Sequence, residues 1–135
     1  MKKFLSLLLA LAVCISLVAC NGKKTKEDLL SEAIVLSPEQ LINEKFDNPA
    51  RAKKEYHDKI VKMTGEIFDI DDDYIAIGFK RNGIPSTSIY VLLDSNSIAE
   101  LEKNTEITIV GKMSVDGSGS GFTNAPCILD AYLVE

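Results

Sequence analysis

The strongest constraint on the fold is an alternation of apolar and polar residues that begins near residue 59 and recurs in four later segments. In the first segment Val61, Met63 and Ile67 occupy alternate positions between charged and hydroxyl-bearing residues. A period of two sends successive side chains to opposite faces of a strand, so each segment has one face to bury. We therefore predict strands over residues 59–68, 74–79, 87–93, 106–115 and 126–134.

Turn-forming residues separate these strands. Residues 69–73 form a polar turn, and residues 81–85 contain Asn82-Gly83, a strong turn signal in a loop longer than a two-residue hairpin. Residues 116–121 alternate glycine with serine and predict a flexible loop. The chain therefore reads as short strands joined by turns, a pattern typical of a small barrel or sandwich.

Helix-start signals occur before the first strand and again between the third and fourth strands. Ser37-Pro38 and Asn48-Pro49 each place a capping residue before proline, which suits the first helical position. Ser97 begins a capping-box sequence that ends in a glutamate three residues later. We predict helices over residues 38–46, 49–56 and 98–103.

The order of three strands, a short helix and two strands resembles the OB-fold, a five-stranded Greek-key barrel. Glycines at Gly65 and Gly111 lie mid-strand, where a small barrel coils sharply or lets two backbones approach. The segments 56–67 and 101–112 resemble the opening strand and the fourth strand of the tRNA_anti-like family. The resemblance covers residues 50–134 and implies a mainly β OB-fold barrel preceded by one or two helices. Many members are exported bacterial proteins or lipoproteins of unassigned function, and the family name does not imply binding of tRNA.

The N-terminal segment resembles a bacterial lipoprotein signal peptide. Lys2 and Lys3 precede an apolar run over residues 4–18, which is shorter than the roughly 20 residues of a membrane-spanning helix. The run ends in Leu-Val-Ala before Cys20, as in a lipobox. The resemblance implies that Cys20 is the first mature residue and is acylated. We therefore expect attachment to the lipid bilayer of the cell membrane or outer membrane, facing outside the cytoplasm.

Four regions follow from these signals: a lipoprotein signal peptide over residues 1–19, a flexible tether over 20–36, a helical segment over 37–57 and the OB-fold domain over 58–135. Loss of the two lysines in the signal peptide would change the formal net charge from −5 to −7. Nucleic-acid binders normally carry a basic patch that contacts phosphates, whereas this chain has an excess of acidic residues.

The sequence offers few groups for catalysis. Cys127 would be the one free thiol of the mature chain, and His57 is the only histidine. Neither a zinc cluster nor a serine or cysteine triad can be assembled in the usual way from these two side chains. Cys127 shares alternate positions with Leu129 and Ala131, so we predict that it points into the core. We expect a protein that is not an enzyme and has no cofactor.

A cluster of aspartates in the predicted turn after the first strand is a weak calcium candidate. Asp69, Asp71 and Asp73 could supply carboxylate ligands. An EF-hand loop starting at Asp69 would need glycine and glutamate where Tyr74 and Lys80 stand. A solvated acidic turn is the alternative, and both interpretations stay open at this point.

The remaining candidate site is the face that OB-folds use for ligands, formed by their second and third strands and the neighbouring loops. Aromatic rings interleaved with cations could stack against sugars, peptides or bases, although some of the rings could instead alternate into the core. We predict a binding module for an envelope protein, a peptide or a glycan, with a single-stranded nucleic acid as the alternative. The candidate ligand-binding residues are Phe68, Tyr74, Lys80, Arg81, Tyr90 and Phe122.

Overall fold

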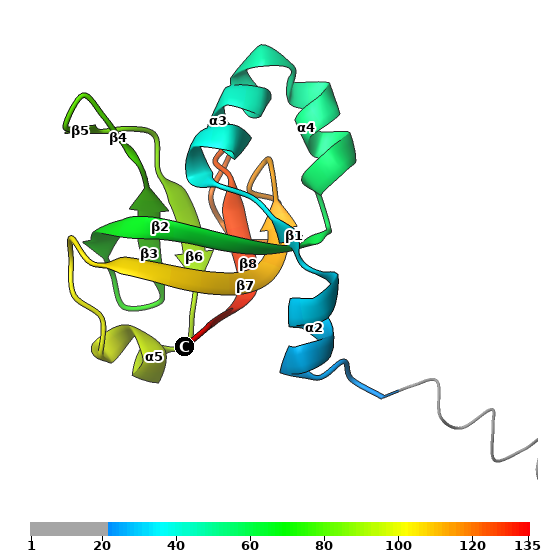
Figure 1. Ribbon diagram of the computed structural model, residues 1–135, viewed down its shortest axis with the longest axis vertical. Helices are drawn as coiled ribbons and strands as arrows, with labels where there is room; N and C mark the ends of the chain where they lie inside the picture. The colour runs from blue at the N-terminus through cyan, green and yellow to red at the C-terminus, as the bar shows by residue number, and fades with distance from the viewer. Residues whose placement is uncertain (1–21) are drawn as a thin grey trace, which may run out of the picture.

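The computed structural model describes residues 22–135, which form a closed barrel with helices at both ends (Figure 1). The strands run in the order β2-β3-β6-β8-β7, and pairing of β2 with β7 closes the barrel. Only the contact between β6 and β8 is parallel among the barrel pairs. This order confirms the predicted OB-fold. The barrel strands are β2 (Ile60–Ile70), β3 (Tyr74–Gly78), β6 (Ile89–Leu92), β7 (Glu106–Ser114) and β8 (Cys127–Leu133).

The period-two pattern of the sequence places the expected side chains inside the barrel. Val61, Met63 and Ile67 of β2 are fully buried, as are their counterparts on the other strands. At Gly111 of β7, a Cβ atom would lie 2.6 Å from Cγ2 of Ile128 on β8. The two strands therefore approach too closely there for any larger residue, which explains a glycine in the middle of a strand.

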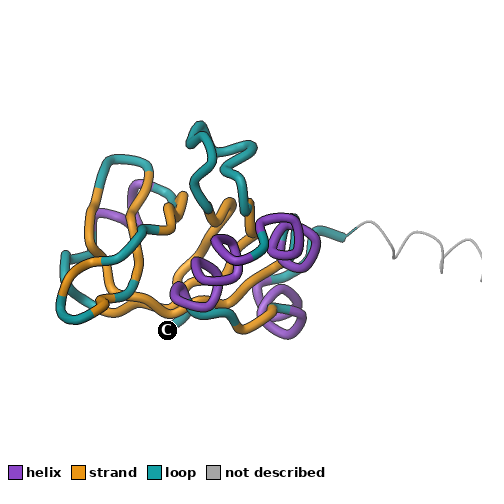
Figure 2. The backbone as a smooth tube through the Cα atoms, turned by 90° about the horizontal axis from the view of Figure 1, so that it is seen from above, coloured by secondary structure: helices purple, strands orange, loops and turns teal. Residues whose placement is uncertain are grey.

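Helices α3 (Pro38–Asp47) and α4 (Pro49–Tyr56) lie across one end of the barrel (Figures 1 and 2). Their N-terminal caps are Ser37 and Asn48, as predicted. The hydroxyl group of Tyr56 on α4 donates a 2.8 Å hydrogen bond to Glu44 on α3. Burial and the Glu44 carboxylate raise the pKa of Tyr56 to about 12. The buried apolar residues of both helices, Leu41, Ile42, Ala52 and Tyr56, belong to the same hydrophobic core as the barrel.

Helix α5 (Ser95–Ala99) lies at the opposite end of the barrel, between the third and fourth barrel strands as expected (Figure 1). Its cap is Asp94, whose carboxylate accepts from the backbone N–H of Ser97 at 3.0 Å. The predicted helix over residues 98–103 is therefore displaced, because Ser97 is the third residue after the cap. Ile98 still packs into the core.

The predicted flexible tether over residues 20–36 contains two ordered elements, α2 (Lys26–Glu32) and β1 (Ile34–Val35), so the prediction is wrong for that part. Thr25 and Asp28 form a reciprocal capping box at the start of α2. The hydroxyl of Tyr132 on β8 donates to the carbonyl of Lys26 at 2.8 Å. β1 then pairs in parallel with β2. Contacts with β2 and with Tyr132, which lies 106 positions from Lys26, thus order this segment.

A small hairpin of β4 (Lys80–Arg81) and β5 (Ile84–Pro85) projects between β3 and β6. Its turn is Asn82-Gly83, with φ angles of 54° and 78°. Positive φ at both central residues is typical of a tight two-residue hairpin, which corrects the longer loop expected here.

The predicted signal peptide and Cys20 lie outside the described residues. No helix within residues 22–135 is both long and apolar enough to cross a membrane.

Candidate functional site

Three of the six predicted ligand-binding residues, Tyr74, Tyr90 and Phe122, form one aromatic cluster, here called the aromatic triad. The rings of Tyr90 and Phe122 stack with centroids 4.0 Å apart and an interplanar angle of 5°. Tyr74 meets both of them edge to face, at 5.5 Å from Tyr90 and 5.0 Å from Phe122. All three side chains are partly exposed, so the triad lies on the outer surface of the barrel.

The register between β3 and β6 places the two tyrosines together. Tyr90 pairs with Ala76, two residues along β3 from Tyr74. Residues with this diagonal relation lie on the same face of an antiparallel pair and within reach of aromatic side chains. Their neighbours Ile75 and Val91 point into the core, so the tyrosines must point outward.

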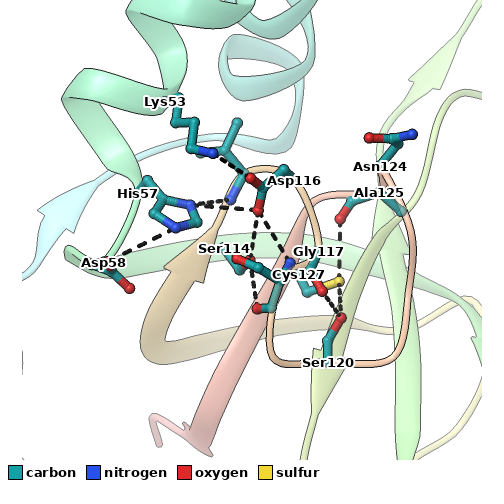
Figure 3. Close-up of polar contacts among 12 residues, drawn as sticks. Lys53, His57, Asp58, Ser114, Asp116, Gly117, Ser120, Asn124, Ala125 and Cys127 are labelled. Carbon is teal, nitrogen blue, oxygen red and sulfur yellow. Dashed lines mark hydrogen bonds and ion pairs between the residues drawn. The ribbon is translucent and has the colours of Figure 1, made fainter.

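Phe122 reaches the tyrosines from the loop over residues 115–126, between β7 and β8. Asp116 anchors this loop: its carboxylate accepts from Nζ of Lys53 at 2.5 Å and from the backbone N–H of Ser118 at 3.1 Å (Figure 3). The backbone carbonyl of Asp116 accepts from the N–H of Asn124 at 2.9 Å. Nζ of Lys45 binds the carbonyl oxygen of Asn124 at 2.5 Å. Lysines from α3 and α4 thus hold both sides of the loop.

Gly117 fixes the path of the loop. Its φ angle is +80°, and a Cβ atom there would lie 1.8 Å from the carbonyl oxygen of Phe122. No side chain fits in that space, so the loop can fold back toward Phe122 only with glycine at this position. The predicted flexible glycine-serine loop is therefore a tightly folded one.

His57 also helps to hold the loop over residues 115–126. It follows α4, its side chain is 19% exposed, and its Nδ1 accepts from the backbone N–H of Val115 at 3.2 Å (Figure 3). The Nδ1 atom also lies 3.8 Å from the carboxylate of Asp116. His57 is thus placed to hold the start of the loop.

Cys127 is buried but does not point into the barrel core as predicted. Its sulfur lies beneath the loop, where it accepts from the hydroxyl of Ser120 at 3.1 Å and donates to the carbonyl of Ala125 at 3.3 Å (Figure 3). Ile128 takes the inward position instead. The alternation breaks at Asp130, whose φ is +50°, so the residues before and after it cannot share one face. Burial raises the pKa of the Cys127 thiol.

The other three predicted ligand-binding residues lie elsewhere. The ring of Phe68 packs over Gly78, 2.7 Å from where a Cβ would be. Lys80 pairs with Glu66 at 2.5 Å. Arg81, on the small hairpin, lies 3.4 Å from the side-chain oxygen of Asn43 on α3. None of the three joins the aromatic triad, because the hairpin carries the two cations away from the triad.

The aspartates at the end of β2 and in the turn that follows it do not converge. Asp69 pairs with Lys103 at 2.5 Å, which lowers its pKa, and Asp71 accepts from the backbone N–H of Asp72. Asp71 also raises the pKa of Tyr74 by hydrogen bonding. Within residues 22–135 no three histidine, cysteine or acidic side chains are grouped so that they could hold a metal ion. The geometry therefore does not support the calcium candidate Asp69, Asp71 and Asp73.

An open cleft of about 580 Å³ adjoins the triad and shares Tyr90 with it. One wall is the tip of the α3–α4 pair, with Ile42 and Phe46, and the other includes Ser88 and Pro126. Phe46 is 74% exposed, an unusual position for a large apolar ring. The sequence contains one signal for this wall, an aromatic residue in the last turn of a short helix.

We expect the contacts that hold the loop over residues 115–126 to weaken at low pH. Hydrogen bonds from Lys53 and Ser118 lower the pKa of Asp116 below its ordinary value. A carboxyl group whose pKa is lower in the folded state than in the unfolded state stabilises the protein above about pH 4. This stabilisation is lost as the pH falls further. Asp116→Asn should therefore lower the free energy of unfolding at neutral pH but reduce its decline between about pH 5 and pH 3. Urea unfolding at several pH values measures both effects.

The matched control is Asp130→Asn, since Asp130 is exposed and makes no side-chain hydrogen bond within residues 22–135. This control should keep the acid slope of the unchanged protein. Equal slopes for the unchanged protein and Asp116→Asn would contradict the anchoring role.

One solved structure, with a TM-score of 0.64, and one family model agree with this architecture. A crystal structure of a Klebsiella pneumoniae lipoprotein that is suggested to bind nucleic acid is similar over 83% of this chain and 100% of its own, with a TM-score of 0.64 and 18% identity. The hypothetical protein ygiW from E. coli covers 76% of this chain and 91% of its own, with a TM-score of 0.42 and 16% identity. No curated protein matches the chain. The model of the tRNA_anti-like family matches residues 1–124, and the chain belongs to that family.

Proposed function

We propose that the protein is a membrane-anchored lipoprotein whose OB-fold domain is a non-enzymatic module for binding a protein, peptide or glycan of the cell envelope. The observation that carries the proposal is the continuity of the aromatic triad with the neighbouring cleft through Tyr90. Together they offer flat rings and a partly apolar hollow at the face where OB-folds bind their ligands.

The side chains around this face suit binding better than catalysis. Within residues 22–135, His57 and Asp116 hydrogen-bond the loop backbone, and Cys127 is sealed beneath the loop. None of these three groups lines the cleft. The aromatic rings and serine hydroxyls that line the site can stack and hydrogen-bond, and the amine of Lys45, which also lines it, is held by the carbonyl oxygen of Asn124.

The charge of the chain bears on the kind of partner. The mature chain would carry a net charge of −7, and Asp71, Asp72 and Asp73 lie directly before Tyr74 in the sequence. An anionic partner would meet repulsion at this edge of the triad. A neutral or basic partner is therefore favoured.

The proposed anchor is the acylated side chain of Cys20. Support comes from the lipobox sequence and from the similar fold of the Klebsiella lipoprotein. Because α2 begins at Lys26, the chain between Cys20 and that helix can span at most about 20 Å. An anchor there would keep the domain close to the bilayer.

A second candidate is a single-stranded nucleic acid. The fold and its surface aromatic rings favour it, since OB-folds often stack bases on such rings. The similar Klebsiella protein is suggested to bind nucleic acid. The acidic charge counts against it, because nucleic-acid binding draws much of its affinity from cations near phosphates.

Replacing Cys20 with alanine should release the protein from the membrane. A single acylated residue is the only anchor in the proposal, so no apolar attachment is left once the apolar run over residues 4–18 has been removed. Cell fractionation and labelling with a fatty-acid analogue measure the change, with Cys127→Ala as the control that keeps the lipid. Incorporation of the fatty-acid analogue into Cys20→Ala at the level of the unchanged protein would exclude the proposed anchor.

Tyr90→Ser and Phe122→Ser should each reduce the amount of partner that co-purifies after crosslinking in cells about tenfold, as expected for aromatic side chains at the centre of an interface. Arg81→Ser is the matched control, because this residue lies on the hairpin away from the triad. Mass spectrometry of the bound protein and sugar measures recovery, and thermal melting shows that the variants fold. Undiminished recovery with both triad variants would remove the triad from the binding site.

A fluorescence-anisotropy titration with single-stranded DNA and RNA oligonucleotides at low salt tests the second candidate. We expect no saturable binding below about 100 μM, because few cations are available near the triad. Saturable binding that is lost in Tyr90→Ser would instead make nucleic acid the ligand.

A further inference from the structure

The parallel ladder between β6 and β8 ends abruptly beside the cleft. Tyr90 pairs with Cys127, and the N–H of Tyr90 donates to the carbonyl of Pro126 at 3.0 Å. The next rung toward the N-terminus of β6 would need an N–H from residue 126. Proline has no N–H, so the ladder cannot continue. The chain before β6, residues 86–88, therefore runs on past the end of its partner strand.

Ser88 is left with unused backbone groups at this point. In a continued ladder its N–H would face the carbonyl of Asn124, but that oxygen accepts from Nζ of Lys45 at 2.5 Å. Within residues 22–135 neither the N–H nor the C=O of Ser88 has a backbone partner. Ser88 lines the cleft, so both groups are within reach of a ligand that enters it.

The opposite wall of the cleft is apolar. Ile42, Phe46 and Pro49 line it at the tip of the α3–α4 pair. Phe46 is 74% exposed, so most of its ring faces water rather than other side chains of the described residues. The cleft of about 580 Å³ can accept an apolar side chain between Phe46 and Tyr90.

We propose that the cleft binds an extended polypeptide segment of a partner protein, which adds as a short strand beside Ser88 and places an apolar side chain against Phe46. This inference rests on the proposed function and names its partner class. Strand addition uses a backbone N–H and C=O that point the same way, and Ser88 offers such a pair. Sugars and nucleotides do not repeat that donor and acceptor pattern at strand spacing.

The charge of the chain limits the segment further. The net charge of the mature chain is −7, so a neutral or basic segment is expected. Lys45 is the one cation that lines the cleft, and it is held by Asn124 and partly desolvated, which lowers its pKa. It offers little to an acidic peptide.

The experiment selects peptides from a random dodecapeptide display library on the full chain held in phospholipid nanodiscs, with empty nanodiscs as the reference. Selected peptides are synthesised with a fluorescent label and titrated by anisotropy. We expect sequences with apolar residues at alternate positions and few acidic residues. Phe46→Ser should weaken their binding about tenfold, since it removes the apolar wall.

Backbone pairing has its own test. Ser88→Pro removes the N–H and should weaken binding about threefold to tenfold, whereas Ser88→Ala keeps it and should bind normally. Should Ser88→Pro not fold, N-methylation along the selected peptide gives the same information. A methyl group should weaken binding at the one peptide residue whose N–H donates to the carbonyl of Ser88, because the N–H groups of its two neighbours face away from that strand.

The outcomes separate this inference from the proposed function. Failure to select any peptide, or equal binding to Phe46→Ser, overturns the strand-addition site. Uniform effects of N-methylation at every residue also overturn it. Loss of the cellular partner in the triad variants would then still support the proposed function, with a glycan or a folded protein as the ligand. If the triad variants also recover the cellular partner in unchanged amount, both the strand-addition site and the proposed function are excluded.

Discussion

The parallel contact between β6 and β8 is the constraint on which the barrel and the candidate site both depend. It closes the space between the first three strands and the last two, and it brings the start of β8 beside Tyr90. The loop that follows β7 must therefore cross the end of the barrel so that β8 can begin next to β6. That path carries Phe122 onto Tyr90 and leaves Pro126 opposite the unpaired backbone of Ser88. One strand pairing thus sets the positions of the triad and of the cleft.

The helices before the barrel give this site its shape. A barrel alone would present the triad on a convex surface, whereas Ile42, Phe46 and Pro49 of the α3–α4 pair form one wall of the cleft beside it. The same helices hold the loop, because Lys45 and Lys53 bind its two sides and His57 binds its start. Burying apolar residues of the helices in the common core fixes these lysines relative to the strands. The shape of the site is therefore a property of the helices and barrel together.

Much of the fold could be predicted because its signals are local. Alternation defined the five strands, and the caps at Ser37 and Asn48 defined α3 and α4. The ordered segment before them was missed, although Thr25 and Asp28 carry a capping box, since its docking depends on Tyr132 at the far end of the chain. A short capping box without an amphipathic pattern gives little indication of such a contact.

The candidate site could be predicted in part for the same reason. The proximity of Tyr74 and Tyr90 follows from strand register. The hairpin of β4 and β5, which places Arg81 away from the triad, gives no signal in the alternation of apolar and polar residues. The orientation of Cys127 depends on a positive φ at Asp130, which no alternation predicts.

The loop over residues 115–126 combines two properties that are usually separate. Its sequence is rich in glycine and serine, which would make an isolated segment flexible. In the folded protein the backbone reversal at Gly117 and the bonds to Asp116 leave it few alternative paths. The loop therefore loses its freedom during folding, and Phe122 is already stacked on Tyr90 in the absence of the proposed ligand. A ring held in advance costs a ligand less conformational entropy to engage, so a small site can still bind specifically.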